Sequence, residues 1–288
     1  MTRIGIIGGS GLYALDGLTN VREIKLETPF GEPSDALVAG ELGGAQVVFL
    51  PRHGRGHRLS PTEVPYRANV FALKSLGVEW LLSVSAVGSL AGDLHPGTIV
   101  IPDQFIDRTV RRSPTFFGNG LVAHVSLADP TCPALHRIVV AAAGEAGVPV
   151  VDGGTYVCIE GPAFSTRAES NLYRSWNAQV IGMTAIPEVR LAREAELHYA
   201  TLALVTDYDC WKTDEEAVSA DGVVAILNRN VANVRRILSH LVPLLESQTS
   251  ELPRCGCADA LRSAILSDKT RVPETVREAL GPLVGKYL

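Results

Sequence analysis

The sequence lacks the features that mark several large classes of protein. No apolar stretch in the 288 residues approaches the roughly 18 residues of a membrane-spanning helix. Runs of Lys or Arg never exceed two residues, and the net charge is -5, which argues against binding to nucleic acid or to a membrane surface. The N-terminus has too short an apolar stretch for a signal peptide, so we expect a cytoplasmic protein.

Cysteine is also scarce, and its scattered distribution excludes a secreted disulfide framework. The five cysteines are Cys132, Cys158, Cys210, Cys255 and Cys257. A bridge between Cys255 and Cys257 would be strained and easily reduced. A structural zinc site needs about four ligands, and the nearest histidine in the sequence, His240, falls on a predicted helix. We therefore expect free thiols and no metal site.

The composition that remains is that of a soluble globular protein with a large core. Hydrophobic residues make up 46% of the chain and charged residues 20%. Strand-length apolar runs alternate with amphipathic helical segments over most of the chain, which predicts one α/β domain. We place that domain at residues 1–248. Residues 249–288 are expected to form an accessory tail with a helix at 259–267.

The predicted elements follow from apolar periodicity and from the glycines that close the helices. Strands are predicted over residues 3–8, 36–39, 46–50, 80–84, 98–102, 148–158, 178–183 and 199–205. Helices are predicted over residues 64–76, 134–146, 167–176, 187–197 and 224–245. Residues 107–125, which contain Pro, Gly and Asn, are expected to form a long surface loop, and residues 26–31 a turn.

Two carboxylates follow the predicted strand at 199–205. Asp207 and Asp209 stand in alternate positions with Tyr208 between them. Open α/β sheets bind ligands beyond the carboxyl ends of their strands. This stretch therefore indicates a ligand site, and a solvated acidic turn is the alternative interpretation.

Other predicted strands end in residues that suit an anion. Ser10 lies in a glycine-rich turn, Arg52 and His53 follow a second strand, and Ser85 and Thr184 end two more. Hydroxyls, free backbone N–H groups and a guanidinium all bind phosphate. A tight turn, a solvated basic loop and ordinary loop chemistry are the respective alternatives.

Two further motifs are discounted. Gly9-x-Gly11-x-x-Ala14 formally matches the dinucleotide-binding fingerprint, but no second strand ending in an acidic residue follows at the required distance. The spacing of His53 and His57 would suit a metal pair on a helix, but the glycines at 54 and 56 make a helix improbable there. We therefore predict neither a dinucleotide nor a metal.

Seven stretches of the sequence together resemble the trimeric purine nucleoside phosphorylases, in particular their methylthioadenosine branch. They are residues 4–11, 28–35, 52–57, 103–109, 159–170, 182–184 and 206–211, and the likeness runs in the family's order from about residue 3 to 245. The resemblance implies an α/β domain whose central sheet is mixed, twisted and partly barrel-like, with helices on its flanks. It also implies a homo-oligomer, either a trimer or a dimer of trimers.

The resemblance implies phosphorolysis of an N-glycosidic bond, a reaction of purine and methionine salvage. Orthophosphate would be the co-substrate, 5′-methylthioadenosine the substrate, and adenine and 5-methylthioribose 1-phosphate the products, with no cofactor. A related enzyme that prefers 6-oxopurine nucleosides, such as inosine, or that has broad specificity, is the close alternative. A non-catalytic nucleoside-binding or NAD-binding protein is an alternative from a different class.

The resemblance also implies roles for individual residues. Those expected to hold phosphate are Ser10, Arg52, His53, Ser85, Ala86 and Thr184. Those expected to contact the nucleoside are Phe164, Ile181, Met183, Asp207, Tyr208, Asp209 and His124, the last donated by a neighbouring subunit. The catalytic carboxylates would be Asp207 and Asp209. Specificity would depend on Ser165, Ala220, Val223 and Val224.

Four positions depart from the pattern of the animal members. Ser10 and Ser85 replace threonines and keep the hydroxyl. Gly182 stands where those members have Asn, so we expect a less strict reading of the purine edge. Ala220 stands where they have Val, so we expect a roomier apolar pocket for the 5′ substituent.

Overall fold

The computed structural model describes residues 2–9, 12, 17–213, 220–248 and 255–288. Within these residues the chain forms one branched sheet of eleven strands. The strands are β1 (Arg3–Gly8), β2 (Thr19–Ile24), β3 (Leu37–Leu42), β4 (Ala45–Pro51), β5 (Trp80–Ser89), β6 (Ile99–Ile101), β7 (Gln104–Arg108), β8 (Val150–Asp152), β9 (Thr155–Ile159), β10 (Val180–Gly182) and β11 (His198–Tyr208). The helices are α1 (Tyr66–Ser75), α2 (Pro133–Glu145), α3 (Arg167–Ser175), α4 (Glu188–Glu194), α5 (Ala220–Gln248), α6 (Glu274–Ala279) and α7 (Gly281–Val284).

The sheet is mixed, as predicted, and it branches at β5. The main path runs β2-β3-β4-β1-β5-β10-β9-β7, while β11 pairs with β5 and with β6, which in turn pairs with β8. Strands β4, β1, β5 and β11 are mutually parallel along this central part. Their carboxyl ends therefore meet at one edge of the sheet, which we call the strand-end face.

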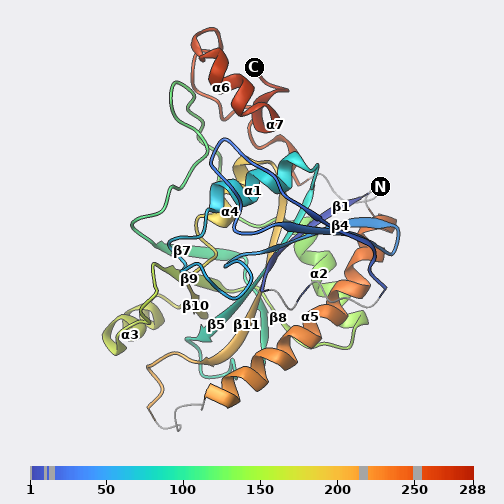
Figure 1. Cartoon of the computed structure of the whole chain (residues 1–288). Coiled ribbons are helices and arrows are strands. Elements are labelled where there is room, and N and C mark those ends of the chain that lie inside the picture. The colour runs from blue at the N-terminus through green and yellow to red at the C-terminus, as the bar shows by residue number, and fades with distance from the viewer. Residues whose placement is uncertain (1, 10–11, 13–16, 214–219, 249–254) are drawn as a thin grey trace.

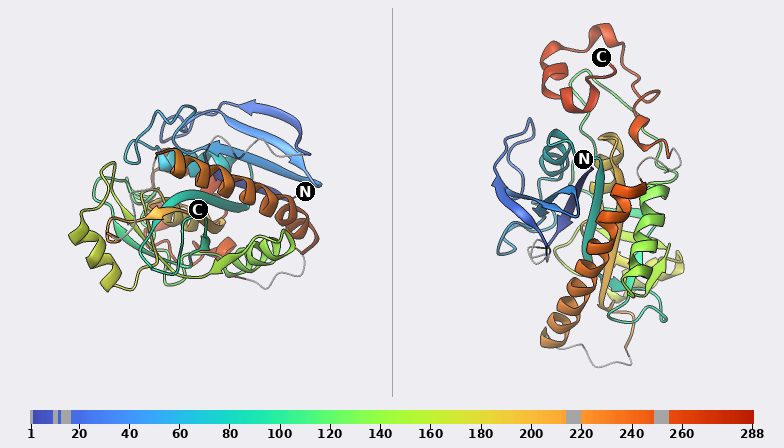
Figure 2. Two further views of the ribbon diagram at one scale, coloured as in Figure 1. Left: turned by 90° about the horizontal axis from the view of Figure 1, so that it is seen from below. Right: turned by 90° about the vertical axis from the view of Figure 1, so that its right-hand side faces the viewer.

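Helices cover both faces of the sheet, because β5 and β11 are apolar on both sides. Helices α2 and α5 pack on one face and share a core cluster with Ile4, Val47 and Leu202. Helices α1 and α4 pack on the other face against Ile7, Leu81 and Ala203. The two layers are visible from the side in Figure 2. This burial on both faces explains why the β11 sequence reads as a continuous apolar run.

Most predicted elements are confirmed with small shifts of their ends, but one strand was not predicted and three predictions need correction. The missed strand is β2, of which five of six residues are exposed and which lies at the edge of the sheet. The predicted strand at 148–158 is two strands, β8 and β9, because Gly153 and Gly154 both have positive φ and break it. The loop expected at 107–125 begins later, since β7 extends to Arg108.

The third correction concerns the C-terminal tail, where the predicted helix at 259–267 is wrong. This segment forms turns after a short 3-10 helix (Cys257–Asp259), and Ile265 makes an antiparallel bridge to Ala123. The helices of the tail come later, at α6 and α7. The tail packs into the main core through Leu261, Leu283 and Val284. Figure 1 shows α6 and α7 beside the green segment that follows β7.

Among the described residues, no helix is both long enough and apolar enough to cross a membrane. The longest helix, α5, spans 29 residues and carries charged residues along its length.

Candidate active site

The strand-end face brings together the polar residues that follow the central strands. Arg52 follows β4 and donates its backbone N–H to the carbonyl of Gly8, at the end of β1 (2.9 Å). Gly88 of β5 is paired with Asp207 of β11 on one side and with Ile181 of β10 on the other. Three of the four predicted strand ends in this region, together with β11, therefore converge as expected. The fourth contains Ser10, which lies outside the described residues.

The branch at β5 leaves part of one edge of that strand without a partner, while the other edge stays paired with β11. On one edge, β1 pairs with β5 only as far as Ser83, and β10 begins to pair at Gly88. Backbone groups between these positions are thus freed from the ladder within the described part of the sheet. Ser85 and Ala86 lie in this interval, Ser85 buried and Ala86 exposed. Free backbone N–H groups beside a hydroxyl make a concavity suited to an anion.

Five buried polar atoms at this face have no hydrogen-bond partner among the described residues. They are Ser85 Oγ, Tyr156 Oη, Ser165 Oγ, Ser170 Oγ and Asp209 Oδ2. Burial raises the pKa of the Tyr156 phenol, and the nearby hydroxyls of Ser85 and Thr184 act in the opposite direction. Buried polar groups in folded proteins are almost always paired. Ser85 lies near Tyr156 and Ser170 near Asp209, so these atoms form two polar groups at one face, where a polar ligand would find both donors and acceptors.

The side chain of Arg52 is fixed by an ion pair and several hydrogen bonds. Its side chain is almost fully buried, and Nε and Nη2 form a two-pronged ion pair with Glu188 at 2.9 and 3.1 Å. Nη2 also donates to Ser83 Oγ, and Nη1 donates to the carbonyl of Val84 at 2.8 Å. Burial opposes the charge, but Glu188 outweighs it and raises the pKa of the guanidinium. Among the described residues these bonds leave one N–H of Nη1 for a ligand.

His53 is neutral at physiological pH. Its Nδ1 lies 2.8 Å from the carbonyl of Leu59, so Nδ1 carries the proton and Nε2 is left as an acceptor. Burial, and secondarily the charge of Arg52, lowers the pKa of His53 to about 4. The ring stacks on His57 with a centroid separation of 4.3 Å. A neutral His53 can accept a hydrogen bond from a protonated phosphate oxygen.

The two carboxylates differ in their surroundings. Asp207 sits just after a break in the register between β11 and β5, and its Oδ1 accepts from Thr206 Oγ1 at 2.8 Å. Burial raises the pKa of the Asp207 carboxyl; Thr206 opposes this shift and the charge of Asp209 adds to it. Burial likewise raises the pKa of Asp209, against the nearby Ser170 hydroxyl. The pair can therefore hold a proton at higher pH than an ordinary Asp.

The residues expected around the purine and ribose lie beside these carboxylates. Ile181 is buried and would meet a Cβ on Gly88 at 3.2 Å. Met183 is half-buried, and its sulfur lies close to Gly161 in the loop before α3. That same loop carries Phe164, a residue that is 83% exposed. Ser165 anchors the loop to the carboxylate strand, since its carbonyl accepts from Cys210 Sγ at 3.2 Å. An exposed aromatic ring here is available to cover a bound base.

The side chain of Tyr208 contacts His95 and Lys212. Its hydroxyl is hydrogen-bonded to His95, and its ring is covered by Lys212 Nζ at 3.7 Å. Its predicted contact with the nucleoside stays a prediction.

His124 belongs to a different part of the subunit. It is exposed, and its backbone N–H donates to the carbonyl of Ala264 in the tail at 2.8 Å. In Figure 1 the green segment that contains it extends toward α6, away from the strand-end face. Ala220, Val223 and Val224 lie in the first turns of α5, and their side chains fall outside the described residues, as Ser10 does.

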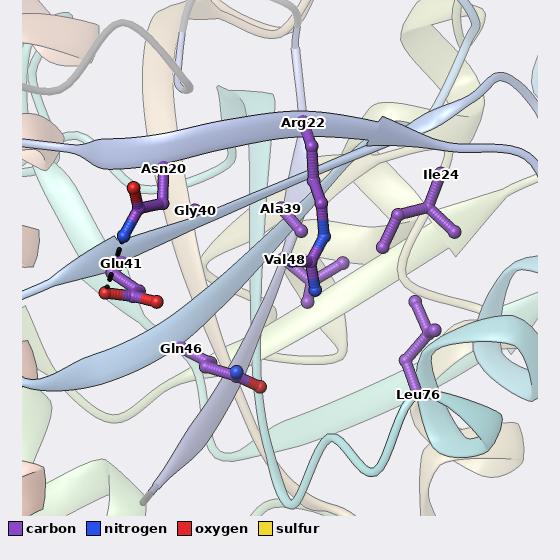
Figure 3. A pocket seen from close by; sticks show the side chains of 9 residues that line it. All are labelled: Asn20, Arg22, Ile24, Ala39, Gly40, Glu41, Gln46, Val48 and Leu76. Carbon is purple, nitrogen blue, oxygen red and sulfur yellow. Dashed lines mark hydrogen bonds between the residues drawn. The ribbon is translucent and has the colours of Figure 1, made fainter.

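Two cavities in the described structure lie elsewhere. A small pocket of about 60 Å³ lies against β2, β3 and β4, where Arg22, Ile24, Val48 and Leu76 line it (Figure 3). Its side wall includes the hydrogen bond between Asn20 and Glu41 at 3.0 Å. Ligand pockets usually enclose about 300–1,000 Å³, so it is too small for a nucleoside. A second cavity, of about 520 Å³, adjoins Asp103, His136, Arg193 and Cys255. We therefore locate the active site from the unpartnered polar atoms and not from either cavity.

Sequence reasoning missed two sets of residues. Glu188 and Tyr156 support the strand-end face from positions far from its motifs, and no local pattern points to them. Cys132 and His198 approach Cys255 and Cys257 only in the folded chain. These four are the candidate metal ligands found in the described residues. The signal that could have found them is a histidine at the start of a buried strand, where an apolar residue is usual.

Comparison with known proteins agrees with this geometry. Residues 3–243 match the family described as the phosphorylase superfamily. The chain is 56% identical over 286 residues to S-methyl-5′-thioadenosine phosphorylase of Geobacter sulfurreducens, covering 99% of each chain. It also resembles the crystal structure of a methylthioadenosine phosphorylase from an Antarctic soil metagenomic library, with 52% identity, a TM-score of 0.93 and 98% of each chain covered.

A more distant solved structure is a complex with adenine. It is a double mutant of adenosine/methylthioadenosine phosphorylase from Schistosoma mansoni, with 38% identity and a TM-score of 0.83. The match covers 93% of this chain and 100% of that one. The match over residues 3–243 and the full-length similarity show that this chain belongs to the phosphorylase superfamily.

Proposed function

We propose that this enzyme cleaves the N-glycosidic bond of 5′-methylthioadenosine with orthophosphate, giving adenine and 5-methylthioribose 1-phosphate. It is a pentosyltransferase, and the relatives that carry this activity match it over their whole length. The observation that carries the assignment is the group of unpartnered polar atoms at the branch of the sheet. The hydroxyls of Ser85 and Thr184 lie near Tyr156, which suits a phosphate, and Asp209 lies near Ser170, which suits an aminopurine.

The phosphate would bind at the edge of β5 that is unpaired between β1 and β10. Ser85, Thr184, the backbone of Ala86 and the remaining N–H of Arg52 would donate to its oxygens. His53 Nε2 would accept from a protonated oxygen, because Nδ1 already donates to Leu59. Ser10 is included in this set only on the basis of its sequence motif. Since Glu188 fixes the guanidinium, Arg52 would mainly hold the nucleophile in line with the ribosyl carbon.

The carboxylates would serve the leaving purine. As the bond from C1′ to N9 breaks, its electron pair moves onto the purine, while a phosphate oxygen forms the new bond to C1′. Asp207, whose pKa is raised by burial, would give a proton to N7. Asp209 Oδ2 would accept from the 6-amino group, which supplies its missing partner. Phe164 and Ile181 would flank the base, and Met183 the ribose.

The 5′ substituent and the assembly are further parts of the proposal. We expect Ala220, Val223 and Val224 to line a roomy apolar pocket, with Ser165 beside it. His124 lies on a segment directed away from its own strand-end face, which supports its predicted role in a neighbouring subunit of a trimer or hexamer. The cytoplasmic location, and the independence from any cofactor in catalysis, stay predictions.

The decisive experiment measures kcat/KM with phosphate for methylthioadenosine, adenosine, inosine and methylthioinosine. We expect methylthioadenosine to be preferred, with adenine released only when phosphate is present. Binding of nucleosides without any turnover would instead favour a binding protein.

The 6-oxopurine alternative is tested by Asp207→Asn. An amide can donate to N7 and to a 6-oxo group, but it cannot deliver a proton. We expect kcat/KM for methylthioadenosine to fall by about 10²–10⁴, the usual contribution of a positioned acid, and the ratio of inosine to methylthioadenosine activity to rise. Equal losses for both substrates would contradict the assigned role of Asp207.

A further inference from the structure

A compact group of metal-binding side chains lies away from the strand-end face. One sulfur or nitrogen atom from each of four residues lies within 4.8 Å of all the others. The residues, which we call the cysteine–histidine cluster, are Cys132, His198, Cys255 and Cys257. Cys132 precedes α2, His198 begins β11, and the other two begin the C-terminal tail. Three segments that are distant in sequence thus contribute to one point.

The distances suit a tetrahedral ion. His198 Nδ1 lies 3.3 Å from Cys132 Sγ and 3.2 Å from Cys255 Sγ. With ordinary Zn–S and Zn–N bond lengths, sulfur and nitrogen ligands of one tetrahedral ion are about 3.6 Å apart. The His198 ring is stacked on Trp80 at 4.0 Å, which fixes its orientation toward the sulfurs. The four ligands are therefore arranged with only small adjustments needed.

Donors from the surroundings contact two of the sulfurs. Arg193 Nη1 donates to Cys257 Sγ at 3.5 Å, and its Nη2 is held by the carbonyls of Asp129 and Thr131. The backbone N–H of Leu135, in the first turn of α2, donates to Cys132 Sγ at 3.4 Å. Three thiolates and one divalent ion leave a net negative charge, which Arg193 offsets. Such outer contacts orient and tune metal ligands.

The turn between Cys255 and Cys257 has a backbone conformation that brings both residues to the cluster. Gly256 has a φ of 70°, in the left-handed region that favours glycine. Cys257 is buried, while Cys255 borders the cavity of about 520 Å³. The cavity gives an ion a path to the cluster.

We propose that the cysteine–histidine cluster is a structural zinc site, in which one divalent ion of the zinc type binds three thiolates and one imidazole. Four protein ligands, two of sulfur from a short turn, are typical of closed structural zinc sites. The ion would tie the tail to the starts of α2 and β11. Beyond the ion, the tail pairs with the segment at 122–124, through the bridge between Ala123 and Ile265. Zinc therefore stabilises the docking of that segment as well.

The first test is metal content. The full-length protein, produced in cells without added metal and purified anaerobically, should contain about one zinc per chain, as a four-ligand structural site requires. Loss of an outer contact alone weakens metal affinity by about 10–100-fold. Cys255→Ser and His198→Gln each remove a ligand, so we expect at least that loss of zinc affinity and a correspondingly lower zinc content. Matched controls are Cys210→Ser and His240→Gln, which change residues outside the cluster and should keep the zinc.

The second test needs no variant. Replacement of the bound ion by Co²⁺ in the wild-type protein should give the strong visible bands of a tetrahedral site and a thiolate charge-transfer band. Removal of the ion with a chelator should make the tail sensitive to protease, a readout independent of catalysis.

Thiol counting separates the competing states. Denatured protein in chelator should show all five thiols if the cluster binds metal. Three reactive thiols, with a cross-linked peptide containing Cys255, would show a disulfide and overturn the proposal. Five thiols with neither zinc nor a tetrahedral cobalt spectrum would overturn it also.

Discussion

Replacing Glu188 by glutamine should destabilise the protein more than any comparable change at its surface. Glu188 and Arg52 form an ion pair whose side chains are 1% and 3% exposed. Glutamine keeps one oxygen that can accept from the guanidinium. Its amide N–H₂ group, however, would face a second donor on Arg52, and the positive charge would remain buried without its counter-charge.

The expected magnitude follows from that geometry. Removing one member of a buried ion pair costs about 3–5 kcal/mol, mostly because the partner is left uncompensated. The hydrogen bond from Tyr199 Oη goes to Glu188 Oε1 at 3.1 Å, the oxygen that also accepts from Arg52 Nη2, so an amide oxygen at this position keeps both bonds. The amide N–H₂ group then replaces Oε2, the acceptor of Arg52 Nε. The melting temperature should fall by roughly 10 °C, since 1 kcal/mol corresponds to about 2–4 °C in domains of this order of size.

The assay is thermal and urea unfolding at one fixed protein concentration, because assembly would otherwise shift the apparent stability. The control is Glu23→Gln, which breaks an exposed pair with Arg55 that is 2.6 Å long and should cost less than about 1 kcal/mol. A double variant, Arg52→Met with Glu188→Leu, should recover much of the stability while losing phosphate binding. If Glu188→Gln cost no more than Glu23→Gln, Arg52 would not depend on this pair.

Three further predictions concern the same face. Gly182→Ala should destabilise the protein by about 1–3 kcal/mol through overpacking, because the added Cβ would lie 2.0 Å from the buried hydroxyl of Tyr156. Combining it with Tyr156→Phe should partly restore the melting temperature, and no restoration would place the strain elsewhere. Burial lowers the pKa of His53 to about 4 in the folded state, against about 6.5 in the unfolded state. The free energy of unfolding should therefore decrease as pH falls from about 6.5 to 4, and His53→Gln should remove that part of the decrease in urea titrations. Since burial raises the pKa of Asp207, kcat/KM for methylthioadenosine should fall as pH rises through that pKa, whereas a rate that rises with pH would require the carboxylate form.

The Gly182 geometry also revises the expectation for the purine edge. The sequence comparison with animal members predicted only a less strict reading of the base. In the structure, the space that an Asn side chain would enter is occupied by Tyr156. The exchange at 182 is therefore coupled to a second residue, which a one-position comparison does not reveal.

Local sequence determined the central strands, most helices and the polar strand ends. A long apolar run such as residues 199–205 can be satisfied only by burial on both faces, and parallel strands place their carboxyl ends at one edge. The sequence alone thus predicts that the motifs at Arg52, Ser85 and Asp207 lie at one site. The exposed strand β2 escaped prediction because its register depends on its neighbour β3 and carries no apolar pattern of its own.

Only the tertiary structure decided which distant residues contact these motifs and which residues form the cysteine–histidine cluster. Glu188 reaches Arg52 across 136 positions of sequence, and the imidazole of His198 reaches the sulfur of Cys255 across 57. Such pairings depend on how the sheet branches and where the tail docks, and neither is written in local periodicity. A cysteine pair two residues apart reads as two free thiols in the sequence, and it becomes half of a four-ligand cluster only when the strand and the helix start are packed beside it.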